Sequence, residues 1–169
     1  MIFNGALTKA KMSEQDKLPQ SVDVGYTLLH DLLVGGQWQK ADSETGTVML
    51  KIADRIKEGW LRESDITKFP QLDLQTIDYL WVKHSQERFG FSVQSCIWKN
   101  VEQDYGKFSD AVGWRLNYRW RQYSELIFKT EAPMGHLPAA PFFKSNLAIG
   151  WAATLMPKLA QSYTIEHTV

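Results

Sequence analysis

The side chains that could carry out catalysis are scattered through this sequence. The chain contains no G-x-S-x-G, G-x-x-x-x-G-K-[ST], G-x-G-x-x-G, H-E-x-x-H or C-x-x-C motif. Its four histidines lie far apart along the chain: His30, His84, His136 and His167. An isolated histidine is more often a structural residue than a catalyst. The sequence therefore favours a non-catalytic protein, and an enzyme would need His84 or His136 to meet a carboxylate in space.

An aromatic and basic stretch is the clearest candidate for binding. Residues Trp114 to Tyr123 include three Arg, four aromatic residues and no acidic residue. Such a stretch could stack on bases and neutralise phosphates. The 19 Lys and Arg of the whole chain balance its 19 Asp and Glu, however, which makes nucleic acid a poor candidate. The same side chains suit a large conjugated ring with carboxylates at its edge. The alternative is that the arginines only extend from a core loop into solvent.

Length and composition fit one globular domain without a membrane segment. The 169 residues are 44% hydrophobic and 22% charged, which is ordinary for a folded domain. Cys96 is the single cysteine, so an intrachain disulfide is excluded. The most apolar run, Leu147 to Met156, is shorter than the roughly 18–20 residues that a membrane span requires. We expect a flexible tail over residues 1–20, a core domain over 21–156 and a C-terminal tail over 157–169.

Hydrophobic periodicity predicts the helices that must position these side chains. Apolar residues at three- and four-residue spacing predict one helix from Ser21 to Gly35 and a second from Trp38 to Ile56. The short connection makes these two an antiparallel pair, whose shared groove suits a flat apolar ligand. Further helices are expected over Ser64–Phe69, Asp73–His84, Ser92–Tyr105 and Asn146–Leu155, with irregular chain from Gly106 to Pro141. The pattern predicts one compact all-α domain.

Several ordered strings carry a family resemblance. They are LLxxGxWxxADxET from Leu32 to Thr45, KFPQLDLQTIDYLWVKHSQERFGFSVQSCIW from Lys68 to Trp98, VGWR from Val112 to Arg115, and APMGHLP from Ala132 to Pro138. Together they closely resemble the genomes-uncoupled-four family. The resemblance extends over roughly residues 26 to 149. Members of that family are tetrapyrrole-binding regulators of magnesium chelatase in cyanobacteria and plastids.

The resemblance implies a cupped-hand domain whose concave palm binds protoporphyrin IX and Mg-protoporphyrin IX. It implies a non-catalytic protein that stimulates the chelatase through its large porphyrin-binding subunit. We expect a monomer without a covalent cofactor or a metal site. The implied location is the cyanobacterial cytoplasm or the plastid stroma, with peripheral membrane association through partners or porphyrin. Divergent members of the family suggest an alternative, which is a bilin-binding or sensory interaction module on the same fold.

The candidate ligand-binding residues come from both lines of reasoning. Trp120 resembles the family's palm-loop tryptophan, Phe128 follows on the far side of that loop, and Lys144 lies where the family often has an arginine that meets a propionate. A lysine there would lose the bidentate fork of arginine. Arg121 and Tyr123 belong to the aromatic and basic stretch. The periodic helices supply the expected palm floor, which consists of Leu29, Leu33, Met49 and Ile52.

Overall fold

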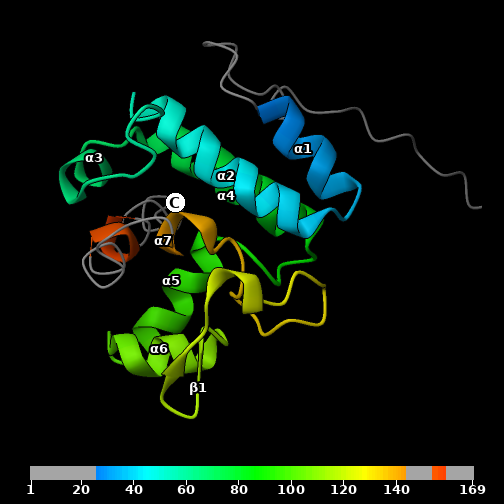
Figure 1. The fold of residues 1–169 in the computed structure, drawn as a ribbon, viewed down its shortest axis with the longest axis vertical. Coiled ribbons are helices and arrows are strands. Elements are labelled where there is room, and N and C mark those ends of the chain that lie inside the picture. The colour runs from blue at the N-terminus through cyan, green and yellow to red at the C-terminus, as the bar shows by residue number, and fades with distance from the viewer. Residues whose placement is uncertain (1–25, 144–153, 159–169) are drawn as a thin grey trace, which may run out of the picture.

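The computed structural model describes residues 26–143 and 154–158. Its helices form two groups in Figure 1, with α7 (Ala140–Phe143) between them. The first group contains α1 (Tyr26–Val34), α2 (Trp38–Ile52), α3 (Glu63–Thr67) and α4 (Gln71–His84). The second contains α5 (Phe91–Asn100), α6 (Tyr105–Ala111), the strands β1 (Arg115–Leu116) and β2 (Arg119–Trp120), and the 3-10 helix η2 (Tyr123–Glu125). The prediction of a single, mostly helical domain is confirmed.

Helices α1 and α2 pack together as the sequence predicts. The link between them turns at Gly36, whose φ of 63° is a conformation that glycine adopts without strain. Helix α2 ends at Ile52, four residues earlier than predicted, because Asp54 takes a positive φ of 54°. Behind this pair, the Nε1–H of Trp81 on α4 donates a buried 2.9 Å hydrogen bond to the Thr45 hydroxyl. These contacts pack α1, α2 and α4 together.

The long helix predicted over residues 92–105 is wrong. Helix α5 ends at Asn100, because Glu102 and Gln103 both adopt positive φ angles, 59° and 62°. A separate helix α6 then begins, and the Asp104 carboxylate caps it by accepting a 2.8 Å hydrogen bond from the Lys107 amide. The chain between residues 106 and 111 is therefore helical and not irregular.

A short hairpin follows α6 where irregular chain was expected. Arg115 pairs with Trp120 and Leu116 with Arg119. The two residues of the turn, Asn117 and Tyr118, both have positive φ, as a two-residue hairpin turn requires. The sequence does not indicate this turn, because Tyr118 stands at the position where glycine is usual. The hairpin brings Trp120 back alongside α6.

The C-terminal part of the chain lies largely outside the described residues. Of the helix predicted over residues 146–155, only 154 and 155 are described, and they are helical together with 156–158. The Ser95 hydroxyl of α5 donates a hydrogen bond to the Met156 carbonyl, and the Thr154 hydroxyl donates one to the Glu63 carboxylate of α3. The segment therefore joins the two groups of helices. In the described part of the chain, no helix is long and apolar enough to cross a membrane.

Candidate functional site

A small apolar hollow lies where α2, the loop before α3 and α7 meet. Its volume is about 210 Å³, open solvent included. Helix α7 and the α2–α3 loop form its walls, and Gly46 adds no side chain to the α2 side. The lining residues are Gly46, Leu50, Gly59, Trp60, Leu61, Ala140 and Pro141. None of these residues carries a charge, so the hollow suits an apolar ligand surface.

Arg55 supports the α2–α3 loop that forms one wall of the hollow. The Arg55 guanidinium lies 5.1 Å from the centre of the Trp60 ring, and its Nε–H donates to the Trp60 carbonyl over 3.4 Å. Ion pairs with Glu58 at 3.0 Å and Asp65 at 3.4 Å hold the guanidinium in place. The Trp60 ring is thus held by the cation beside it.

A buried carboxylate connects α2 to the other wall. Asp42 is fully buried and accepts hydrogen bonds from the Tyr123 hydroxyl at 2.6 Å and from the Ala139 and Ala140 amides at 2.6 and 2.9 Å. Burial, and then the adjacent Asp42 charge and hydrogen bond, raise the pKa of the Tyr123 hydroxyl. The hydroxyl therefore stays protonated and acts as a donor.

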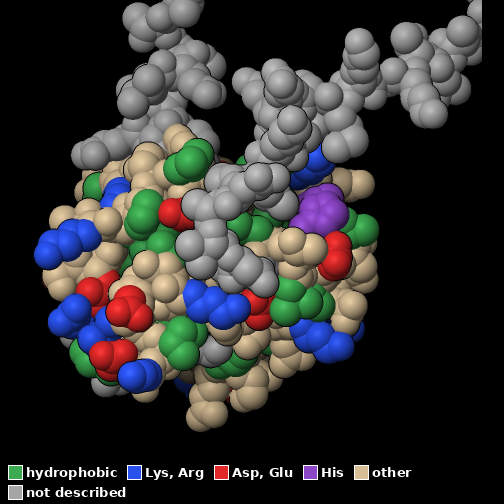
Figure 2. All heavy atoms as spheres, turned by 90° about the horizontal axis from the view of Figure 1, so that it is seen from above, with side chains coloured by type: hydrophobic (Ala, Val, Ile, Leu, Met, Phe, Trp, Pro, Cys, Tyr) green, Lys and Arg blue, Asp and Glu red, His purple; other side chains and the backbone are tan. Residues whose placement is uncertain are grey.

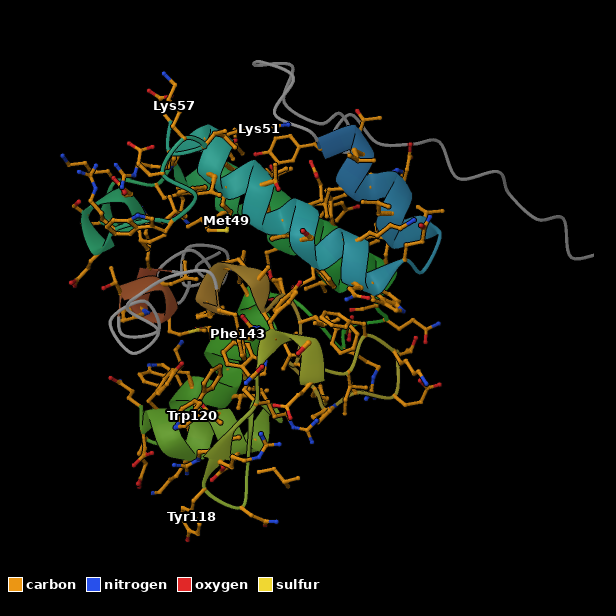
Figure 3. All side chains as sticks on the ribbon, in the orientation of Figure 1. Met49, Lys51, Lys57, Tyr118, Trp120 and Phe143 are labelled. Atoms are coloured by element: carbon orange, nitrogen blue, oxygen red, sulfur yellow. The ribbon has the colours of Figure 1, made fainter. Side chains whose placement is uncertain are left out.

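An aromatic cluster continues from α7 toward the hairpin. Tyr123 lies 5.4 Å from Phe128 and 6.0 Å from Phe143, measured between ring centres. Arg121 donates to the Glu125 carbonyl over 3.0 Å, while its Nε–H is buried without a hydrogen-bond partner. In Figure 3, Phe143 lies between Met49 on α2 and Trp120 on the hairpin. The aromatic cluster, defined as Tyr123, Phe128 and Phe143, thus joins the region of the hollow to the hairpin.

The hairpin holds Trp120 at the surface by stacking. The Trp120 ring lies 5.2 Å from the Tyr105 ring at an interplanar angle of 20°, and 44% of the residue is exposed. The Arg115 guanidinium lies over both Tyr118 and Trp120, at 5.5 and 5.7 Å from their ring centres, and pairs with Asp110 at 2.6 Å. Trp120 therefore offers a supported aromatic surface to a ligand.

The structure brings only some of the predicted site residues together. Tyr123 and Phe128 meet in the aromatic cluster, and Arg121 lies two residues before Tyr123 in the chain. Ile52 is partly buried at the end of α2. Lys144 lies outside the described residues.

The residues of the expected palm floor differ in their exposure from what a ligand contact needs in this structure. Leu29, Leu33 and Met49 are at most 2% exposed, so in this structure they form part of the core and offer no surface to a ligand. Helical periodicity identifies a buried face, but it does not tell whether protein or ligand covers that face. The α2 side chain that reaches the hollow is that of Leu50, which neighbours Met49, and Gly46 lines it with backbone.

The sequence reasoning also missed Trp60, Leu61, Ala140 and Pro141. The available sequence signal was the Gly59–Trp60 pair, in which a large aromatic residue follows a glycine. In the structure this glycine has a φ of 74° and Trp60 lines the hollow. An aromatic side chain directly after a turn is a reasonable candidate for a pocket wall. Ala140 and Pro141 carry no such signal, because their place in the hollow depends on long-range packing.

Two histidines that an enzyme could have used have other roles. The His136 ring is fully buried, its Nδ1–H donates to the Val112 carbonyl at 2.6 Å, and its Nε2 accepts from the Ile127 amide at 2.9 Å. His84 lies edge to face with His30, with ring centres 5.1 Å apart, in the other group of helices. Among residues 26–143 and 154–158, no three His, Cys, Asp or Glu side chains could hold a metal ion together.

His136 predicts a loss of stability in mild acid. Burial lowers the pKa of its imidazole in the native protein. In mild acid the imidazole is therefore protonated more readily in the unfolded chain than in the native protein. The contribution of His136 to the free energy of unfolding should therefore fall as pH drops below about 6.5, by at most about 1.4 kcal/mol per pH unit for one proton. Urea unfolding at pH 7.5 and 5.5 measures this loss.

His136→Gln is the matched comparison, because glutamine can accept from the Ile127 amide and does not titrate. Burial raises the pKa of Asp78 to about 6, but this group is common to both proteins and cancels in their difference. The stability advantage of the wild type over His136→Gln should shrink between pH 7.5 and 5.5. A constant difference would mean that His136 does not titrate in this range.

Comparisons with known proteins agree with this architecture. Residues 19–155 match the model of the family described as GUN4-like. A protein from Porphyra purpurea named uncharacterized protein ycf53 is 38% identical over 124 residues, which is 72% of this chain and 52% of that protein. The chloroplastic tetrapyrrole-binding protein of Arabidopsis thaliana is 34% identical over 125 residues, which is 67% of this chain and 47% of that protein. The chain spans about half the length of these curated relatives.

Solved structures show the same fold. The structure of GUN4 from Chlamydomonas reinhardtii matches with a TM-score of 0.71 and 31% identity over 86% of this chain and 97% of that one. The ligand-free structure of Arabidopsis thaliana GUN4 matches with a TM-score of 0.67 and 33% identity over 80% of this chain and 93% of that one. The resemblance seen in the sequence motifs is thereby confirmed, and this chain belongs to the GUN4-like family.

Proposed function

We propose that this protein binds a tetrapyrrole, namely protoporphyrin IX or its magnesium complex, and acts as a non-catalytic regulator of magnesium chelatase. The observation that carries the proposal is the uncharged hollow between α2 and α7, continued by the aromatic cluster and the exposed face of Trp120. Such a surface suits a large conjugated ring. Family membership, and the name of the Arabidopsis relative, point to the same ligand class.

The size of the hollow limits how a macrocycle could bind. The volume of about 210 Å³ includes open solvent, so the enclosed space is smaller still and cannot take a whole macrocycle. We infer that the hollow takes one edge of the ring, while the remaining surface lies against α7 and the aromatic cluster. If about 400 Å² of apolar surface leaves water, the gross gain is about 10 kcal/mol. Association costs of several kcal/mol then leave a micromolar or somewhat tighter complex.

The carboxylates of the ligand need basic partners at the edge of this surface. Arg121 is a candidate, because it lies two residues before Tyr123 of the aromatic cluster and arginine can pair with a carboxylate through two hydrogen bonds. Lys51 and Lys57 are both exposed, but Figure 3 shows them on the other side of α2 from Phe143. Lys144 remains a candidate from the sequence resemblance alone.

The surface charge does not favour a nucleic-acid ligand. On the face shown in Figure 2, basic, acidic and hydrophobic side chains are interspersed. The arginines of the hairpin are paired with carboxylates, Arg115 with Asp110 and Arg119 with Glu125. Binding to a phosphate backbone depends on basic groups that are free to replace counterions.

The direct test is a titration of the purified protein with deuteroporphyrin, its magnesium complex and, in parallel, biliverdin. We expect saturable porphyrin binding, seen as a shift of the porphyrin absorption band. Trp120→Ala should raise the dissociation constant about threefold to tenfold through lost stacking, and Trp120→Phe should restore most of the affinity. Preference for biliverdin would support the bilin-binding alternative, and failure to bind either ligand class would refute the proposal.

The regulatory part of the proposal has its own assay. Addition of the protein to magnesium chelatase should raise the rate of magnesium insertion, through contact with the large porphyrin-binding subunit. A sensory module would leave that rate unchanged. We propose that the protein acts as a monomer in the cyanobacterial cytoplasm or plastid stroma, with any membrane association through its partners or porphyrin. Relatives from Synechocystis and from the Arabidopsis chloroplast support this location.

A further inference from the structure

Asp42 is a buried carboxylate that connects three segments of the chain. It is fully buried, and it accepts hydrogen bonds from the Tyr123 hydroxyl and from the backbone amides of Ala139 and Ala140. Burying a carboxylate is costly unless several donors compensate it. Donors to a charged acceptor form stronger hydrogen bonds than neutral pairs do. The arrangement therefore ties three segments firmly to one side chain.

The three tied segments are the ones that shape the candidate site. Ala139 directly precedes α7 and Ala140 begins it, and Ala140 and Pro141 line the hollow. Tyr123 belongs to the aromatic cluster. On α2, Gly46 and Leu50 follow Asp42 at intervals of four residues, so they lie on the same face of the helix and complete the hollow. One carboxylate therefore sets the distance between α2 and α7 and the place of Tyr123.

We propose that Asp42 is a positioning residue for the tetrapyrrole site. Its carboxylate holds α7 and Tyr123 against α2 in the geometry that binds the ligand. The proposal rests on the proposed function, because it concerns the same surface. Asp42 itself is covered by protein and does not touch the ligand. Its substitution should therefore change affinity through the position of α7, even when the protein stays folded.

The test compares two variants with a control from the same helix. Asp42→Asn keeps the size of the side chain but removes its charge and turns one acceptor into a donor. Tyr123→Phe removes one hydrogen bond and leaves the amides of Ala139 and Ala140 bound. Thr45→Val is the control, because it removes a buried hydrogen bond to Trp81 on the face of α2 that packs against α4. Each protein is titrated with Mg-deuteroporphyrin by absorption and unfolded in urea.

We expect the dissociation constant to rise about tenfold or more in Asp42→Asn and about threefold in Tyr123→Phe. In Thr45→Val it should change less than about twofold, although that variant also loses stability. The bound porphyrin should show a shifted absorption maximum in Asp42→Asn, because its surroundings change. An unchanged dissociation constant in a folded Asp42→Asn protein would overturn the proposal, and so would an equal loss of affinity in Thr45→Val.

A second measurement needs no ligand. In Asp42→Asn, the amide hydrogens of Ala139 and Ala140 should exchange with solvent well before the core of the protein opens, whereas Thr45→Val should leave them protected. Continued protection in Asp42→Asn would show that the carboxylate does not hold α7. If the wild type binds no porphyrin, the proposed function fails, and the exchange measurement still decides whether Asp42 positions α7.

Discussion

Replacing Trp114 with alanine should lower the free energy of unfolding by about 3–5 kcal/mol. Trp114 is 1% exposed and lies at the centre of the second group of helices. Its ring contacts Phe108, Phe142 and Phe143, with ring centres 5.5, 4.9 and 5.6 Å away, and its Nε1–H donates to the His136 carbonyl at 2.8 Å. Truncation would leave a cavity between α6 and α7 and an unpaired carbonyl.

Urea unfolding at pH 7.5 measures this effect, and Trp114→Phe is the comparison. Phenylalanine keeps much of the aromatic packing but cannot donate to His136, so it should cost about 1–3 kcal/mol. Trp120→Ala is a useful contrast because that residue is 44% exposed and should cost much less. A loss in Trp114→Ala no larger than in Trp120→Ala would mean that Trp114 does not support the core as the contacts indicate.

The contrast between these two tryptophans shows where sequence reasoning reaches its limit. Both lie in one stretch of ten residues that looked like a single binding motif. The structure divides it: Trp114 is part of the core, while Trp120 returns to the surface through a two-residue turn. The turn depends on positive φ at Asn117 and Tyr118. Residue types alone gave no reason to expect that conformation at a tyrosine.

The helices were easier to predict than the site. Periodic apolar residues locate α1, α2 and α4, because burial of one face is a local property of the sequence. The hydrogen bonds of Asp42 connect residues that are 81 to 98 positions apart. No local pattern encodes such contacts, so the residues of α7 that line the hollow could not be deduced. Family motifs named the ligand class, whereas only three-dimensional packing showed that Leu50, and not Met49, reaches the hollow.

Filling the hollow should abolish most porphyrin binding while the domain remains folded. Leu50 is partly buried and lines the hollow, which opens to solvent. The larger indole of Leu50→Trp can occupy that space with little displacement of the core, so the free energy of unfolding should change by less than about 1.5 kcal/mol. The indole would exclude the edge of the ligand from the hollow, so the dissociation constant for Mg-deuteroporphyrin should rise about tenfold or more.

Leu28→Trp is the matched control for this prediction. It introduces the same side chain on α1, where Leu28 is 51% exposed and does not line the hollow. Its dissociation constant should stay within about twofold of the wild type. Binding is followed by porphyrin absorption, because the added tryptophan would complicate a measurement by protein fluorescence. Unaltered affinity in a folded Leu50→Trp protein would place the ligand elsewhere on the molecule, since a macrocycle edge and an indole cannot occupy the same hollow of about 210 Å³.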